Sequence, residues 1–252
     1  TNGKEVLTAN YSGGNMSVFR LRKDGTLSPA EALFKGTANG PDTIRQIVPH
    51  IHCALFSPDG KYIFATDFSA DRILRFTLSS EGNISRLPGE ATDIAPDSGP
   101  RHLTFSPNGK FAYLINELSG KVIAFGYTDG TLEQIQSIAA DSLQARGSAD
   151  IHLSPDGKFL YASNRLEGDG IAIFTVDTVN GTLTRAGYQP TGIHPRHFNI
   201  TPNGKYLLAA CRDSNVIQVY ERDTENGLLR DTQQDILIDK PVCVQFIPPF
   251  HN

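Results

Sequence analysis

Cysteine is scarce in this chain, which limits the chemistry available to it. The 252 residues include only Cys53, Cys211 and Cys243, and their spacing matches no metal-binding motif. Cys53 and Cys243 each lie five residues before a proline, Pro58 and Pro248. We expect all three to be buried free thiols, so no cysteine-based metal site is expected.

A surplus of basic residues is also missing, as is any long hydrophobic run. The 27 acidic residues outnumber the 23 basic ones and give a formal net charge of −4 at pH 7. A general nucleic-acid binder needs a broad basic face, so nucleic-acid partners are not expected. No stretch approaches the length of a membrane span. With 39% hydrophobic residues the chain can still bury a sizeable core, which favours a soluble globular body.

A helical hydrophobic period is absent as well, and a repeated turn motif stands in its place. The prolines of this motif, together with Pro248, are spaced 49, 48, 47 and 46 residues apart. A repeat of about 40 to 50 residues with strands between turns is typical of modules that bury their faces against neighbouring modules. The motif reads FSPDGKY at 56–62, FSPNGKF at 105–111, LSPDGKF at 153–159 and ITPNGKY at 200–206.

Each module contains four short strand-like runs. The proline of the turn presets φ, and the glycine accepts the positive φ that the turn requires. A third run ends in an aromatic residue, and a Gly-x-Leu/Ile step opens a fourth. The pattern predicts an all-β protein, a β-propeller of four-stranded blades in a single domain over residues 1–252. The aromatic residues are Phe76, Phe125, Phe174 and Tyr220.

The two ends of the chain do not carry complete modules. Residues 1–11 align with the second half of the turn and the second strand, so the first module lacks its first strand. Residues 241–248 align with a first strand, and we expect them to complete the N-terminal blade as a clasp that hides both sheet edges. This count gives five blade equivalents. Because the chain enters in mid-turn without an initiator methionine, we expect an N-terminal truncation, whose open sheet edges would promote dimerisation.

Candidate functional residues stand where the modules differ from one another. The position six before the proline has the parity of an apolar strand residue, yet three of its five occupants are polar. It holds His52, Arg101, Ala149, Arg196 and Val242, and the position ten after the proline holds Phe68, Glu117, Arg165 and Arg212. Hairpin geometry predicts that the position six before the proline lies opposite the ninth or the tenth residue after it, at the open end of the hairpin, so Arg101 and Glu117 should be neighbours.

These side chains should gather at the mouth of the central channel, which the first strands line. Arginine at a strand end is often only a solvated rim residue, but several of them at one mouth favour an anionic ligand. Further inward-facing polar residues extend the candidate substrate-binding site, with a structural role as their alternative. They are His102, Asp150, His152 and His197.

Three segments resemble a known family closely. GPRHLTFSPNGKFAYLINEL at 99–118, ADIHLSPDGKFLYASNR at 149–165 and HPRHFNITPNGKYLLAACRDSNVIQVY at 194–220 are similar to the propeller lactonases, the group of propeller-type bacterial 6-phosphogluconolactonase and fungal carboxy-muconate lactonizing enzyme. The resemblance implies a seven-bladed ring, a cytoplasmic location, no required cofactor and a small anionic lactone as substrate. It places the family's functional residues on His52, Arg101, Glu117 and Arg165, with Arg196 as an alternative for the last.

The resemblance leads to a functional hypothesis with alternatives. Hydrolysis of 6-phosphogluconolactone to 6-phosphogluconate needs a general base, and Glu117 or His52 would supply it. Arg101 would stabilise the oxyanion, and Arg165 with Arg196 would hold the phosphate. A cycloisomerase of the muconate-lactonizing type would use the same residues differently. A non-catalytic ligand-binding or interaction propeller also remains open. A calcium-dependent lactonase is disfavoured, because the chain shows no convergent set of oxygen ligands, and no metal site is predicted.

Overall fold

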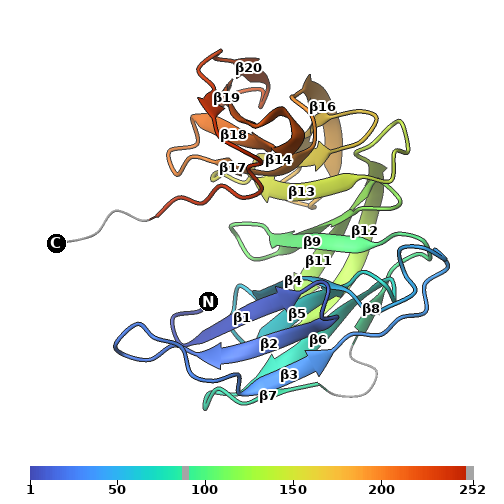
Figure 1. Ribbon diagram of the computed structural model, residues 1–252, viewed down its shortest axis with the longest axis vertical. Coiled ribbons are helices and arrows are strands. Elements are labelled where there is room, and N and C mark those ends of the chain that lie inside the picture. Colours follow the sequence, from blue (N-terminus) through green and yellow to red (C-terminus); the bar gives the residue numbers. More distant parts are fainter. Residues whose placement is uncertain (87–90, 248–252) are drawn as a thin grey trace.

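The computed structural model describes residues 1–86 and 91–247, and almost all of its regular structure is β (Figure 1). The first sheet has three strands in the order β1 (Glu5–Asn10), β2 (Asn15–Arg20) and β3 (Ala32–Lys35). It thus lacks a first strand, as the sequence predicted. The single helical turn in the described part of the chain is η1 (Arg212–Ser214).

Four further sheets follow, each built of consecutive antiparallel strands. The second contains β4 (Ile51–Phe56), β5 (Tyr62–Asp67), β6 (Arg72–Leu78) and β7 (Ile84–Ser85), with β8 (Ala91–Asp93) also paired to β6. The third contains β9 (Pro100–Phe105), β10 (Phe111–Asn116), β11 (Lys121–Thr128) and β12 (Thr131–Ala139). The fourth contains β13 (Ser148–Leu153), β14 (Phe159–Asn164), β15 (Gly170–Val176) and β16 (Leu183–Pro190). The fifth contains β17 (Pro195–Ile200), β18 (Tyr206–Cys211), β19 (Val216–Arg222) and β20 (Leu229–Asp231), with β21 (Ile236–Leu237) paired to β19.

The sheets succeed one another along the long axis of the molecule, from blue to red in Figure 1. Their first strands form an inner row in which β9 lies against β4 and β13, and β13 lies against β17. The hydrophobic core fills the spaces between successive sheets; one cluster joins Tyr113 and Ile115 of β10 to Leu160 and Ala162 of β14. This arrangement confirms the predicted all-β fold of propeller blades.

The repeated turn has the conformation that its sequence requires. The turn glycines have φ values of 70° at Gly60 and 69° at Gly109, where a side chain would be strained. In the first of these turns, the Ser57 hydroxyl donates to Asp59 (Oγ–Oδ1 2.5 Å) and accepts from the Tyr62 backbone N–H (3.0 Å). The Ser/Thr-Pro-Asp/Asn-Gly motif is therefore a self-contained turn that closes one end of the four later sheets.

The predicted clasp at residues 241–248 is wrong for residues 241–247. Residues 241–247 form no strand, and Pro248 lies outside the described residues. Val244 instead bonds to β17, where its N–H donates to His197 Nδ1 (3.2 Å) and its carbonyl accepts from Asn199 Nδ2 (3.1 Å). The reason is spatial, because the N-terminal sheet lies at the opposite end of the row of sheets (Figure 1).

The three cysteines differ in their exposure. All three cysteines are free; Cys211 is buried and Cys53 is partly buried, but Cys243 is exposed, contrary to expectation. Cys243 lies in the segment that does not pair as a strand, and this explains its exposure. Within residues 1–86 and 91–247, no helix is long and apolar enough to cross a membrane.

Candidate active site

The first strands carry a register irregularity at the position that the repeat analysis selected. Asn116 pairs with Pro100 and Ile115 with His102, so Arg101 is an extra residue in β9. His52 and Arg196 are passed over in the same way in β4 and β17. Glu117 lies opposite Gly99, two residues from Arg101, so the two site positions are not directly opposed. The regular ladder would place Arg101 opposite Asn116, and the β-bulge, which the sequence does not reveal, shifts the register by one more residue. Bulges re-aim side chains, and they often lie beside active sites.

Arg101 and Glu117 are nevertheless neighbours, as predicted. Arg101 Nε lies 2.9 Å from Glu117 Oε2, and Arg165 Nη2 lies 3.1 Å from the same oxygen. The other oxygen, Oε1, accepts from Arg45 Nη2 at 2.6 Å. One carboxylate is thus held by three guanidinium groups.

The three arginines differ in exposure. The side chain of Arg101 is 2% exposed and that of Arg165 is 6% exposed, whereas that of Arg45 is 39% exposed. Arg45 was missed by the sequence analysis because it comes from the connection between β3 and β4. That connection has no counterpart in the repeated motif, so no periodic signal marks it.

Electrostatics keep Glu117 ionised. Burial alone would raise the pKa of its carboxyl, but the charges of Arg165 and Arg101 and the hydrogen bond from Arg45 outweigh burial and lower the pKa. Burial, reinforced by the charge of Arg165, lowers the pKa of Arg101 to about 10, which leaves it charged at neutral pH. Glu117 is consequently a poor proton acceptor and an effective anchor for the arginines.

A cavity of about 240 Å³ lies over this cluster. Within the described part of the chain, the side chain of Arg196 makes no hydrogen bond or ion pair, although it lines this cavity. Arg101 does not line it. The cavity walls are formed by Tyr11, Arg45, His52, Glu117, Arg165, Leu166, His194 and Arg196.

His52 enters the cavity as a neutral imidazole. Burial lowers its pKa well below the usual value, and the nearby charge of Arg101 lowers it further. Its Nδ1 is buried and has no hydrogen-bond partner among residues 1–86 and 91–247. The ring packs edge-on against Tyr11 and His102, with centroids 5.3 and 4.9 Å away.

His194 is a second cavity residue that the sequence analysis did not find. It is buried and has a φ of 63°, an unusual conformation for a residue other than glycine. Arg165 Nη1 lies 3.4 Å from its Nε2, and Arg212 Nη2 lies 3.3 Å from its Nδ1. Burial and these two arginines lower the pKa of His194 to about 4. A neutral His194 therefore accepts a hydrogen bond from Arg165. No sequence pattern predicts this role.

The four other predicted substrate-binding residues form a separate cluster that does not line the cavity. His102 Nδ1 lies 2.6 Å from Asp150 Oδ1, and His152 Nε2 lies 3.0 Å from Asp150 Oδ2. His197 Nε2 lies 3.5 Å from the same oxygen. The cluster is joined to the cavity by Arg101, whose Nη1 is 3.4 Å from His102 Nε2.

The donor types in this cluster also suit a metal ion, since ligand atoms of Asp150, His152 and His197 lie within 4.8 Å of one another. The hydrogen bonds argue against that use. The Val244 N–H donates to His197 Nδ1, so a neutral His197 carries its proton on Nε2, the atom that would have to bind the metal. Asp150 also accepts the backbone N–H groups of Ile151 (3.0 Å) and Phe198 (3.2 Å). We therefore interpret the cluster as a hydrogen-bonded network.

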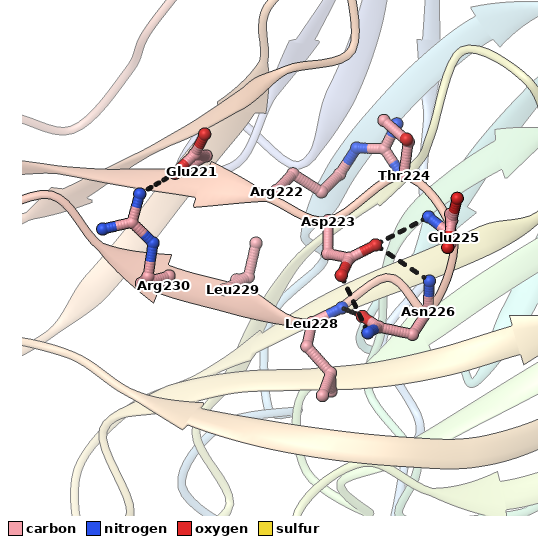
Figure 2. Close-up of a pocket in the computed structure, with 9 residues that line it drawn as sticks. All are labelled: Glu221, Arg222, Asp223, Thr224, Glu225, Asn226, Leu228, Leu229 and Arg230. Carbon is pink, nitrogen blue, oxygen red and sulfur yellow. Dashed lines mark hydrogen bonds and ion pairs between the residues drawn. The ribbon is translucent and has the colours of Figure 1, made fainter.

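A larger hollow of about 590 Å³ lies at the turn between β19 and β20 (Figure 2). Its polar groups bond to one another: Asp223 Oδ1 accepts the backbone N–H groups of Glu225 (2.7 Å) and Asn226 (3.2 Å), and Arg230 pairs with Glu221. All of its walls come from one hairpin. The smaller cavity, in contrast, is lined by residues from several blades, so it is the better candidate for the active site.

Comparison with known proteins gives a consistent result. The family model described as "Lactonase, 7-bladed beta-propeller" matches residues 1–246. The chain is 39% identical over 255 residues to a 6-phosphogluconolactonase of Formosa agariphila, and the match covers 99% of this chain and 72% of that protein. It is 36% identical over 247 residues to a 6-phosphogluconolactonase of Bacillus subtilis, with 96% and 70% covered.

Solved structures agree with this. A Bacteroides uniformis protein with a provisional 6-phosphogluconolactonase assignment has 74% identity and a TM-score of 0.97, covering 98% of this chain and 72% of that one. The periplasmic gluconolactonase PpgL of Pseudomonas aeruginosa has 33% identity and a TM-score of 0.92, with 98% and 71% covered.

Proposed function

The chain belongs to the seven-bladed β-propeller lactonase family, and from this premise we propose that it hydrolyses 6-phosphogluconolactone to 6-phosphogluconate. Two curated relatives at 39% and 36% identity bear the name of that activity. A fold alone does not define a substrate, so the choice of substrate rests on the residues that line the cavity.

The observation that carries the proposal is the charge of the cavity. Arg196 faces it without a protein partner in the described residues, and the single carboxylate, Glu117, is shared by three arginines. Positive charge therefore exceeds negative charge in a partly enclosed space. Guanidinium groups bind phosphate and carboxylate with paired hydrogen bonds, which favours an anionic substrate.

The pKa is lowered for both candidate bases, so their hydrogen-bond partners decide between them: arginines hold both oxygens of Glu117, whereas His52 Nδ1 has no partner among the described residues. His52 is neutral and reaches the cavity, whereas Glu117 is held by the arginines as a stable anion. We assign the general base to His52, which takes a proton from water as the water oxygen attacks the lactone carbonyl carbon. The ring carbon–oxygen bond then breaks, and the same imidazole returns the proton to the leaving oxygen.

The arginines take different parts in this scheme. Arg165 and Arg196 line the cavity and would stabilise the oxyanion and bind the phosphate. Arg101 is 2% exposed, so it acts on Glu117 and does not touch substrate, in contrast to the role suggested by sequence. His102, Asp150, His152 and His197 would support Arg101 from behind. The scheme uses no cofactor.

The deciding experiment compares lactone opening with and without the protein, after subtraction of spontaneous opening. We expect faster hydrolysis of 6-phosphogluconolactone than of gluconolactone, and a decrease of about 100-fold or more for His52→Gln with an unchanged fold. Preference for gluconolactone would favour the activity named for PpgL. Turnover of muconolactones alone would favour a cycloisomerase, and no turnover of any lactone would favour a binding propeller.

Two subsidiary expectations accompany the proposal. A cytoplasmic location follows from the family's usual role and is checked by cell fractionation; the relative PpgL is described as periplasmic. Dimerisation through open sheet edges is checked by light scattering.

A further inference from the structure

Arg45 differs from the other cavity arginines in origin and in the use of its donors. It comes from the β3–β4 connection, while Arg165 and Arg196 come from the repeated modules. Its Nη2 is the atom that contacts Glu117 Oε1 (2.6 Å) and Tyr11 Oη (3.5 Å). Within the described residues, its Nε and Nη1 donate no hydrogen bond. One edge of the guanidinium group is therefore occupied and the rest is available to a ligand.

The backbone beneath Arg45 is firmly held. Asp42 Oδ1 accepts the N–H groups of Ile44 and Arg45, both at 2.8 Å. The Gln46 side chain closes the same turn, as its Oε1 accepts from the Asp42 N–H (3.1 Å) and its Nε2 donates to the Phe68 carbonyl (2.9 Å). These hydrogen bonds fix the backbone of the β3–β4 connection, which carries the partly exposed side chain of Arg45.

Ion pairs join the β3–β4 connection to the β8–β9 and β12–β13 connections. Arg146 Nη2 lies 2.6 Å from Asp42 Oδ2 and 2.7 Å from Asp97 Oδ1, and its Nη1 donates to Asp97 Oδ2 at 2.8 Å. The Arg45 guanidinium also lies over the Phe68 ring, 5.3 Å from its centroid. Backbone and side chain are therefore both preorganised at the cavity, which reduces the entropy lost when an anion binds.

From this geometry we propose that Arg45 determines specificity for a phosphorylated lactone, binding the substrate's phosphate through guanidinium N–H groups that Glu117 leaves free while Nη2 stays on Glu117. The inference rests on the proposed function and deepens it. Arg196, a cavity arginine that has no protein partner in the described part of the chain, supplies a second contact to the same dianion. A guanidinium group bound to Glu117 and to phosphate at the same time links substrate recognition to the carboxylate that orders the site.

The test is the ratio of kcat/KM for 6-phosphogluconolactone to that for gluconolactone. Arg45→Ala should lower this ratio by roughly 30-fold, because a charge-assisted contact to the phosphate is lost. Arg45→Lys retains the charge without the fork and should recover part of the ratio. Arg22→Ala is the matched control, since Arg22 is an exposed arginine bonded to the Leu27 carbonyl on the β2–β3 hairpin. An Arg45→Ala ratio equal to wild type would overturn the proposal.

A binding measurement separates this inference from the proposed function. Thermal stabilisation by 6-phosphogluconate should exceed that by gluconate in the wild type, and Arg45→Ala should abolish the difference. If no lactone is turned over but this difference is lost in the variant, the hydrolase proposal fails and the phosphate site stands. If lactones are turned over and the variant keeps both the difference and the ratio, the phosphate site fails and the hydrolase stands.

Discussion

The two ends of the blades follow different rules. At the turn end, the same motif returns in four modules, and its glycines have φ values of 70°, 69°, 70° and 71°. At the cavity end, the equivalent bulge positions carry a histidine, an arginine, an alanine beside an aspartate, and a second arginine. Uniformity at one end maintains the architecture, and variety at the other end supplies the chemistry. Mutations at the two ends should therefore have separable effects.

The largest effect is expected at the cavity end, from Glu117→Ala. Removing the carboxylate leaves Arg101 and Arg165 buried without their counter-ion, which typically costs about 3–5 kcal/mol of stability. Activity should be lost as well, because the arginines repel one another once Glu117 is gone. Chemical denaturation and the lactone assay measure the two effects. Glu225→Ala, in the exposed β19–β20 turn, is the control and should change neither; a stable, active Glu117→Ala protein would contradict the role of the cluster.

A smaller effect is expected at the turn end, from Gly181→Ala. Gly181 has a φ of 78°, and an added methyl group would overlap the Phe111 ring. Overpacking typically costs about 1–3 kcal/mol, and the backbone strain of an alanine at positive φ adds to it. Gly60→Ala is the matched variant, because its φ is 70° but the added methyl group meets open space, so only the backbone strain of about 1–2 kcal/mol remains. Both variants should keep wild-type kcat. A selective loss of kcat would contradict the expectation that mutations at the turn end leave catalysis unchanged.

The last effect depends on pH and is absent at neutral pH. The pKa of His194 is about 4 in the folded protein and lies near 6.5 when unfolded, so the unfolded chain binds the proton more readily between these values. The contribution of His194 to stability is complete above pH 6.5 and is lost as the pH falls towards 4. His194→Gln should flatten the stability profile across this window, as followed by urea unfolding at several pH values. Arg165, Arg212 and Asp213 face the ring, so their protonation states must stay constant, and an unchanged profile would refute the prediction.

How far the sequence predicted this molecule depended on repetition. The blades, the turn glycines and the Arg101–Glu117 contact were correct because each follows from comparing modules at fixed intervals. Arg45 was missed because it lies in the β3–β4 connection, outside the repeated strand and turn motif. His194 was missed because its importance comes from a left-handed backbone and two arginine contacts, neither of which is written in residue type.

The errors have equally physical causes. Counting residues across a hairpin assumes a regular ladder, so the extra residue at Arg101 shifted the expected register by one. The clasp was inferred from matching strand sequences, but pairing also requires two edges to be close in space. Val244 bonds to His197 and Asn199 of β17 instead. The catalytic and substrate-binding roles of individual residues stay predictions until the assays above are carried out.

The extra residue in the first strands has a consequence for how such a protein can change. A residue on the bulge has no partner in the regular pairing of the two strands. Neighbouring hydroxyl groups bond to the backbone beside it: Thr66 Oγ1 accepts the Cys53 N–H and Ser163 Oγ accepts the Asp150 N–H, both at 3.0 Å. Each duplicated module thus inherits one position at which new chemistry can be tried at little structural risk. Positions 52 and 196, which line the cavity, are where evolution, or a protein engineer, can retarget the site to a different small molecule without redesigning the scaffold.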